Sequence, residues 1–152
     1  MKIFFSKLKR WFIEEPKKKV LIISGPTGSG KTRTSIDISK ILKGEIINCD
    51  SIQMYKELNI GSNKSIDETI PHHLFNIVSI EDTEAIGAGD FSKMARKLIN
   101  EIHSRNCVPI CVGGSGFFIQ NLIYGAPENP KSSIETKEKL FEELKLIGWE
   151  KG

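Results

Sequence analysis

Residues 20–32 have the sequence VLIISGPTGSGKT, and the fold prediction starts from them. The first four of these residues form a continuous apolar run with β-branched side chains, which predicts a buried strand of a parallel sheet at 20–23. Residues 25–32 then satisfy the pattern G-x-x-x-x-G-K-[ST] in full. Because the pattern stands between a predicted strand and a predicted helix, it indicates a phosphate-binding loop (P-loop).

The residue types of this loop suit phosphate chemistry. Glycines let the backbone curl so that its N–H groups face a phosphate, and the following helix adds the positive end of its dipole. Lys31 is expected to neutralise the terminal phosphates, and the Thr32 hydroxyl to bind Mg²⁺. The predicted phosphate-binding residues are Gly25, Pro26, Thr27, Gly28, Ser29, Gly30, Lys31 and Thr32. The chain is therefore expected to bind a Mg²⁺-bound di- or triphosphate.

Strand and helix patterns alternate along the rest of the chain. Gly44 is expected to end the first helix. Residues 87–89 are expected to interrupt regular secondary structure, and Asp90 is expected to cap the helix that follows them. This alternation predicts the α/β class, with a P-loop NTPase-like open, mostly parallel sheet flanked by helices. The expected strands are 20–23, 45–49 and 108–112, with a weaker candidate at 75–78, and the expected helices are 31–42, 52–58, 90–102, 117–124 and 134–147.

Three loops fall at the carboxyl ends of predicted strands: 25–32, 50–53 and 113–115. Ligands of open α/β sheets bind beyond these ends, so the three loops are expected to form one site. The spacing leaves three interpretations of Asp50. It is a Mg²⁺-organising carboxylate, a general base that takes a proton from an acceptor, or a cap for the helix predicted at 52–58.

The length and composition of the chain predict one soluble globular domain. The chain has 152 residues, of which 39% are hydrophobic and 27% charged. The net charge of +3 is uneven, because residues 1–19 carry +5 and leave −2 for the remainder. This basic extension fits an amphipathic helix on a membrane surface or on RNA, or an ordinary terminal helix or tail packed on the domain.

Targeting and redox features are those of a cytoplasmic protein. No run approaches the roughly 20 apolar residues that span a bilayer, and the apolar residues of 1–19 are broken by charges, unlike a signal peptide. The odd count of cysteines, at Cys49, Cys107 and Cys111, predicts free thiols in a reducing compartment. Their spacing does not suit zinc.

Five further blocks carry a resemblance when they are taken together with the P-loop. In order and spacing they resemble the tRNA dimethylallyltransferase (tRNA isopentenyltransferase) family, from about residue 20 to residue 150. Each block is short, and the specificity lies in the set. The blocks are 50–56 (DSIQMYK), 59–64 (NIGSNK), 71–74 (PHHL), 90–91 (DF) and 112–118 (VGGSGFF).

The resemblance implies transfer of a dimethylallyl group from its diphosphate to N6 of an adenosine next to a tRNA anticodon. It implies that residues 27–32 hold the donor diphosphate, that Thr32 serves Mg²⁺, and that Asp50 is the general base, with Thr27 as a second catalytic residue. The implied partners are dimethylallyl diphosphate and tRNA, bound by a monomer. The implied tRNA contacts are Asp50, Ser51, Ile52, Gln53, Ser115 and Lys137.

The chain departs from the family pattern at several points. Residues 61–65 replace a Gly-Thr-Ala-Lys-Pro block, Ser115 replaces a threonine, and Lys137 stands where an arginine is usual. Family members also continue well beyond position 152. The resemblance thus divides the chain into a basic extension at 1–19, a P-loop core at 20–125, and a linker with the start of a helical tRNA-binding region at 126–152. The donor site is expected to be complete and the acceptor site incomplete.

Alternative functions remain open from the sequence. A small-molecule kinase would use the same P-loop for ATP, but residues 120–152 contain no arginine for a kinase lid. A non-catalytic diphosphate-binding fragment would bind the donor without turnover. A family variant takes free adenine nucleotides as acceptor. The histidines at 72–73 could contact phosphate, but they are expected to be structural or on the surface. The aromatic residues Phe117, Phe118 and Tyr124 could stack on a base, but their place in an apolar helix predicts that they pack in the core.

Overall fold

The computed structural model describes residues 19–60, 62, 64, 66–82, 86–125 and 134–147. Residues 1–18 of the basic extension and 126–133 of the expected linker lie outside this set. The elements in chain order are β1 (Leu21–Ser24), α2 (Lys31–Leu42), β2 (Gly44–Asn48), the 3₁₀ turn η1 (Ile52–Met54), β3 (His72–His73), α3 (Ala88–Ser104), β4 (Val108–Gly113), α4 (Gly116–Tyr124) and α5 (Ile134–Ile147).

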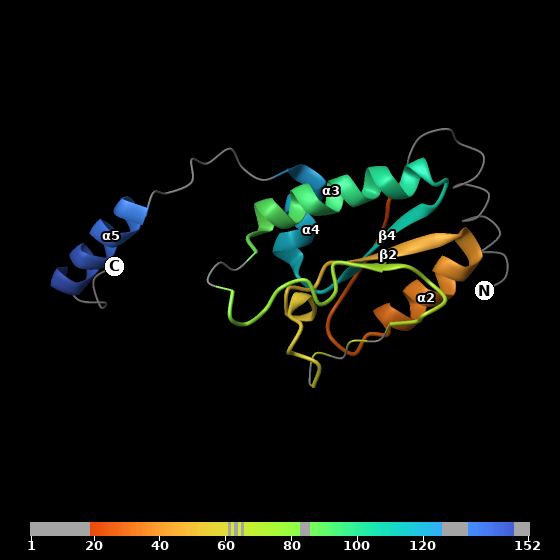
Figure 1. The fold of residues 1–152 in the computed structure, drawn as a ribbon, viewed down its shortest axis with the longest axis horizontal. Helices are drawn as coiled ribbons and strands as arrows, with labels where there is room; N and C mark the ends of the chain where they lie inside the picture. The colour runs from red at the N-terminus through yellow and green to blue at the C-terminus, as the bar shows by residue number, and fades with distance from the viewer. Residues whose placement is uncertain are drawn as a thin grey trace.

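The four strands form one parallel sheet in the order β1-β4-β2-β3. Helix α2 covers one face of the sheet, and α3 with α4 covers the other (Figure 1). Helix α5 is drawn apart from these layers (Figure 1). The predicted α/β fold with a P-loop NTPase-like parallel sheet is confirmed. None of the helices in the described part of the chain is long and apolar enough to cross a membrane.

Both faces of the sheet are buried, each under its own helix or helices. Successive strand residues point to opposite faces, so neighbouring residues belong to different cores. On β2, Ile46 belongs to the core under α2 and Ile47 to the core under α3 and α4. The second core includes a stack of Phe91 on Phe118, with ring centroids 4.3 Å apart. Burial on both sides explains why β1 and β4 are nearly continuous apolar runs rather than alternating ones.

Two of the three cysteines lie inside this core. Cys49 and Cys111 are fully buried, Cys107 is half-buried, and all three are free thiols, as the sequence predicted. A hydrogen bond with Cys111, together with burial, raises the pKa of the Cys49 thiol far above its ordinary value. Cys49 therefore stays protonated and acts as a small core residue.

Gly44 does not end the first helix as predicted. The C-cap is Lys43, which has a φ of 55°, and Gly44 is the first residue of β2. A β-carbon on Gly44 would lie 2.5 Å from Cδ1 of Ile110. The glycine is therefore used for a close approach between neighbouring strands, not for a helix stop.

The helix predicted at 52–58 and the strand predicted at 75–78 are both wrong. Only Ile52–Met54 makes a turn, because Tyr55 is extended and forms a bridge with Val78. The strand lies earlier, at His72–His73, since Leu74 and Asn76 have positive φ angles of 62° and 54° that end regular pairing.

The predictions for the third and fourth helices also need correction. Helix α3 begins at Ala88 with Gly87 as its N-cap, so residues 87–89 start the helix rather than break it. Asp90 lies in the first turn instead of capping, where its charge still suits the helix dipole. Phe117 and Tyr124 are 68% and 82% exposed, so the expectation that they pack in the core is wrong; Phe118 alone of the three is buried.

Gly113 stands where β4 passes closest to the end of β2. A β-carbon there would lie 2.2 Å from both the carbonyl carbon and the oxygen of Cys49. The same pair of strands is joined just beyond the ladder by a 2.8 Å hydrogen bond from the Cys49 N–H to the Val112 oxygen. Any side chain at 113 would therefore push the two strand ends apart.

Gly113→Ala is expected to lower the free energy of unfolding by about 1–3 kcal/mol, the usual range for overpacking a core. Gly116→Ala is the matched control, because its β-carbon would meet no atom within 4 Å. That variant is expected to stay within about 1 kcal/mol of the parent chain. Urea unfolding measures both, and equal effects of the two substitutions would contradict the close approach at Gly113.

An ion cluster joins three elements at the amino end of β2, away from the P-loop. Glu45 is only 5% exposed. Its carboxylate accepts hydrogen bonds from Arg105 at 3.0 Å (Nε) and 2.8 Å (a terminal guanidinium nitrogen), and lies 2.7 Å from Nε2 of His73. These contacts tie β2 to β3 and to the C-cap of α3. The hydrogen bonds of Arg105, aided by His73, hold the pKa of Glu45 below its ordinary value of 4.5, although burial opposes them.

Glu45→Gln is expected to flatten the acid limb of the stability curve. Because the folded-state pKa of Glu45 is lowered, its contribution is complete above a pH of about 4.5. It is lost as the pH falls through the lower folded value. Urea midpoints measured from pH 7 to pH 3 should therefore fall less in the variant than in the parent. The exposed Glu81→Gln serves as the control, and a variant curve parallel to the parent curve would rule out this role for Glu45.

Candidate diphosphate site

The P-loop connects the end of β1 to the start of α2, as the motif requires. Gly28 and Gly30 have φ angles of 80° and 81°, a left-handed conformation that glycine adopts without a steric penalty. Gly30 is the N-cap of α2, and its carbonyl accepts the Thr34 N–H at 3.0 Å. The first turn of the helix therefore opens directly onto the loop, which is the arrangement that binds a phosphate.

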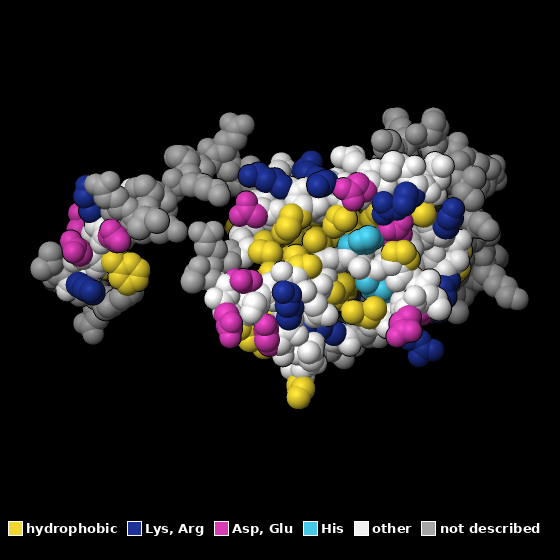
Figure 2. All heavy atoms as spheres, in the orientation of Figure 1, with side chains coloured by type: hydrophobic (Ala, Val, Ile, Leu, Met, Phe, Trp, Pro, Cys, Tyr) yellow, Lys and Arg dark blue, Asp and Glu magenta, His cyan; other side chains and the backbone are white. Residues whose placement is uncertain are grey.

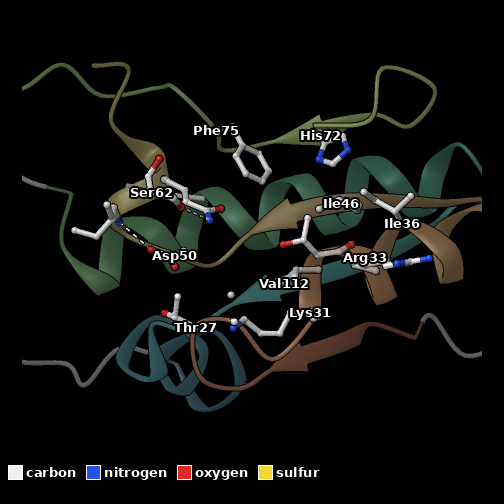
Figure 3. Close-up of a pocket in the computed structure, with 17 residues that line it drawn as sticks. Thr27, Lys31, Arg33, Ile36, Ile46, Asp50, Ser62, His72, Phe75 and Val112 are labelled. Carbon is white, nitrogen blue, oxygen red and sulfur yellow. Dashed lines mark hydrogen bonds between the residues drawn. The ribbon is translucent and has the colours of Figure 1, made fainter. Parts of the chain in front are cut away.

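Lys31 folds back across its own loop. Its Nζ donates to the carbonyl of Pro26 at 2.6 Å. In the close-up, Lys31 and Thr27 lie on the side of the pocket formed by the loop, with Asp50 across from them (Figure 3). A positive charge is thus held at the mouth of the loop, where the terminal phosphates of a ligand would lie.

The three predicted loops meet at one pocket of about 570 Å³. This volume is within the usual range for a small-molecule site. Gly25, Pro26, Ser29, Ser51 and Ser115 do not line it. The predicted site residues that do line it are Thr27, Gly28, Gly30, Lys31, Thr32, Asp50, Ile52 and Gln53, and Gly113 of the third loop joins them.

Part of the pocket was not anticipated from the sequence. Figure 3 shows Ile36 and Ile46 beneath His72 and Phe75, at the end of the pocket away from Asp50. Figure 2 shows apolar side chains gathered around histidines on this face of the molecule. The pocket therefore joins a polar, phosphate-binding end to a more apolar end. The unpredicted lining residues are Arg33, Ser35, Ile36, Ile46, Ser62, His72, Phe75 and Val112.

Helical spacing was a usable signal for some of these residues. Ser35 and Ile36 lie three and four positions after Thr32, so a helix that begins at the P-loop must place them on the same face. Phe75 offered no such signal, because its place depends on the left-handed residues on either side of it. A pattern of apolar residues does not reveal that kind of turn.

Asp50 serves as a local cap and also lines the pocket. Its Oδ1 accepts the Ile52 N–H at 3.0 Å, which supports the short turn η1. Its own N–H donates to Oδ1 of Asn48 at 2.9 Å. The carboxylate is half-buried and faces Thr27 and Lys31 across the pocket (Figure 3). Capping and chemistry at Asp50 are therefore compatible.

Ser115 supports the Asp50 loop from behind. Its backbone N–H donates to the Cys49 oxygen at 3.2 Å, and its Oγ accepts the Ser51 N–H at 3.0 Å. The contact with the Ser51 N–H needs only a hydroxyl oxygen at position 115. The serine that replaces the threonine of the family pattern therefore keeps this contact. Ser115 is also the N-cap residue of α4, which fixes that helix beside the site.

Side-chain hydrogen bonds hold residues 59, 62 and 64 of the block at 59–64, in which the structure describes residues 59, 60, 62 and 64. Nζ of Lys64 donates to the Tyr55 carbonyl, to Oδ1 of Asn76 at 2.7 Å and to Oδ1 of Asn59 at 3.2 Å. The lysine kept from the family pattern therefore has a structural task. Nε2 of Gln53, a predicted tRNA contact, donates to the Ser62 carbonyl at 2.9 Å.

The remaining predicted residues are placed as follows. Lys137 lies in α5, and its side chain falls outside the described residues. His73 belongs to the Glu45 cluster, as expected for a structural histidine. His72 accepts the Asp67 N–H at 3.2 Å and lines the pocket. Burial lowers the pKa of His72, which favours a neutral ring there.

Metal binding at this site would depend on the ligand. The described residues contain no group of three or more His, Cys, Asp and Glu side chains that could hold a metal ion. Mg²⁺ needs few protein ligands when phosphates supply the rest. The hydroxyl of Thr32 lines the pocket at the first turn of α2 and fits that role.

The strand–loop–helix unit with its lysine, and the acid after the next strand in the chain, define a P-loop protein of the α/β class. The family model described as IPP transferase matches residues 53–151. The chain belongs to this family. A model of papillomavirus helicase matches residues 1–55, the segment that includes the P-loop.

Relatives and solved structures agree with this family. The chain is 44% identical over 142 residues to a tRNA dimethylallyltransferase of Anoxybacillus flavithermus, covering 86% of this chain and 45% of that protein. It is 41% identical over 124 residues to one of Koribacter versatilis, covering 80% of this chain and 40% of that protein.

The fold matches the crystal structure of full-length tRNA isopentenylpyrophosphate transferase from Bacillus halodurans, with a TM-score of 0.70 and 34% identity. That match covers 87% of this chain and 44% of the other. It also matches a eukaryotic dimethylallyltransferase acting on tRNA, with a TM-score of 0.71, over 82% of this chain and 32% of the other. The chain thus spans less than half the length of these proteins.

Lys31→Ala is expected to weaken binding of Mg²⁺-pyrophosphate by about 10- to 100-fold, because one charge-assisted hydrogen bond contributes roughly 1.5–3 kcal/mol. Isothermal titration calorimetry measures this affinity. Lys97→Ala, an exposed lysine on α3, is the control and should bind like the parent chain. If both variants bind equally well, the anion is held somewhere other than the P-loop.

Proposed function

We propose that this chain carries the donor half of a tRNA prenyltransferase. The reaction transfers a dimethylallyl group from dimethylallyl diphosphate to N6 of an adenosine next to the tRNA anticodon. The observation that carries the proposal is that Asp50 faces Thr27 and Lys31 across one pocket (Figure 3). Family membership and the names of the relatives support it.

The P-loop residues stabilise the leaving group. As the carbon–oxygen bond of the donor breaks, negative charge collects on the diphosphate, and Lys31 with the loop N–H groups lies where that charge develops. The hydroxyl of Thr32 and the phosphates would hold Mg²⁺, which would supply further positive charge to the leaving group. Thr27 stands at the tip of the loop toward Asp50 and orients the donor. The carbon skeleton that remains is an allylic, cation-like fragment.

Asp50 then acts as the base. The exocyclic amine of adenine is a weak nucleophile, and it must lose a proton as it attacks the allylic carbon. A carboxylate within hydrogen-bond reach of that amine accepts the proton. Hydrogen bonds to its backbone N–H and to Oδ1 hold Asp50 in place, so it does not have to be ordered when the substrate arrives.

The acceptor enters from the side of residues 50–53. A stacked adenine must leave its stack to reach the carboxylate, and Ile52, which is 51% exposed, lies at this entrance. We assign the surrounding tRNA contacts to Ser51 and Gln53, to Ser115 acting through Ser51, and to Lys137. Further contacts would come from the portion of the family length that this chain does not span. A cytoplasmic monomer is the simplest form consistent with this assignment.

Asp50→Ala is expected to abolish transfer, with a loss of at least about 100-fold, while the affinity for the donor stays near that of the parent. The assay incubates the chain with labelled dimethylallyl diphosphate, Mg²⁺ and unmodified tRNA, and scores label on N6 of adenosine. Asp37→Ala, an exposed acid on α2, is the matched control and should retain full activity.

Each other outcome has a defined meaning. Equal loss of donor binding and transfer in Asp50→Ala would remove Asp50 from the role of base. A folded parent chain that binds the donor but transfers nothing would be a non-catalytic donor-binding half. Phosphate transfer from ATP to a small molecule would instead indicate a kinase.

A further inference from the structure

Asn48, the last residue of β2, is fully buried and sits directly behind Asp50. Its side-chain amide makes three hydrogen bonds within the chain. Nδ2 donates to the carbonyl of Asp50 and to the carbonyl of Leu74, both at 3.0 Å, and Oδ1 accepts the Asp50 N–H at 2.9 Å. The sequence patterns gave Asn48 no task beyond its place in the strand predicted at 45–49.

Two of these bonds grip Asp50 from both sides. Regular strand structure ends at Asn48, so Asp50 lies beyond the sheet ladder. Its backbone N–H and C=O are bound instead by the amide of Asn48, which substitutes for a neighbouring strand. With the backbone held in this way and Oδ1 bound to the Ile52 N–H, the direction of the carboxylate is fixed.

The third bond reaches a distant segment that forms another wall of the pocket. Leu74 has a φ of 62° and Asn76 a φ of 54°, and Phe75 between them lines the pocket. A left-handed conformation is sterically unfavourable for a residue such as Leu74. Such residues persist only where the surroundings hold them. The bond from Asn48 to the Leu74 carbonyl is one such restraint, and it is buried.

We propose that Asn48 is a positioning residue that sets Asp50 and the Phe75 wall relative to each other. It does not touch the donor pocket, and it acts through these two residues. The role rests on the proposed function, in which Asp50 must meet the amine while the pocket holds the donor. A displacement of the base by about 1 Å can lower a rate by about 100-fold.

The position requires an amide in particular. Aspartate has the same shape and keeps the acceptor for the Asp50 N–H, but its carboxylate has no proton to donate to the two carbonyls. Alanine removes all three bonds and leaves buried polar groups without partners. Asn48→Asp therefore removes only the two bonds that the amide donates, whereas Asn48→Ala removes all three.

The test compares Asn48→Asp and Asn48→Ala with the same changes at Asn121. Asn121 is 4% exposed and its Nδ2 donates to the Phe117 carbonyl at 2.8 Å, inside α4. It is thus a buried amide of the same kind that does not line the pocket. Circular dichroism fixes a temperature at which every variant is folded, and all measurements are made there.

Both Asn48 variants should bind Mg²⁺-dimethylallyl diphosphate within about twofold of the parent. Their rate of transfer from the preformed donor complex should fall by about 100-fold, the loss expected for a misplaced base. The Asn121 variants should change neither value. A loss confined to donor affinity, or a rate unchanged from that of the Asn121 variants, would overturn the proposal.

Hydrogen exchange supplies a readout that does not need turnover. The Asp50 amide should exchange faster in Asn48→Ala, which removes its acceptor, and should remain protected in the Asn121 variants. If the parent chain transfers no prenyl group, the proposed function fails on its own. Hydrogen exchange then tests by itself whether Asn48 holds the Asp50 backbone. Unchanged protection of the Asp50 amide in Asn48→Ala would overturn the proposal.

Discussion

The site depends on the pairing of β4 with β1 on one side and with β2 on the other. Parallel strands end at the same edge, so this pairing delivers the P-loop after β1 and Asp50 after β2 to one edge of the sheet. Because β4 lies between them, the two are separated by two strand spacings, roughly 10 Å. That separation leaves room for a phosphate group and a reacting carbon between the lysine and the carboxylate. If β1 were paired directly with β2, the separation would be about half as large.

Backbone contacts beyond the ladder preserve this geometry. The β2–β4 pairing continues past the last strand residues through the Cys49 N–H to Val112 and the Ser115 N–H to Cys49. Gly113 has no room for a side chain there, which keeps the two strand ends close. The buried amide of Asn48 then takes over where the ladder stops. Hydrogen bonds thus hold the backbone in place as far as Asp50, the residue proposed to accept a proton.

Sequence patterns predicted the parts of the molecule that are determined locally. The bounds of the helices at 31–42 and 134–147 match α2 and α5, because amphipathic spacing determines them. The P-loop was complete as a motif, and the strand–helix alternation was enough to predict a parallel sheet. The meeting of the three loops at one pocket followed from the sheet rule alone, before any distance was known.

Several of the errors share a different physical cause, since each of these concerns a residue whose conformation depends on a distant partner. Tyr55 leaves its predicted helix to bridge Val78. Gly44 is needed for Ile110 to pack, not for a helix end. Phe75 enters the pocket because left-handed residues flank it. Neither propensity nor periodicity in a single sequence carries these tertiary contacts, and the turn at Phe75 is the one that brings a side chain to the pocket.

A crystal structure of this chain with Mg²⁺ and the unreactive thiolodiphosphate analogue of dimethylallyl diphosphate would test the proposed donor geometry. The diphosphate is expected on the P-loop against Lys31 and Thr32. The first carbon of the prenyl group is expected between the loop and Asp50. A diphosphate bound elsewhere, or a prenyl carbon on the side of the loop away from Asp50, would rule this geometry out.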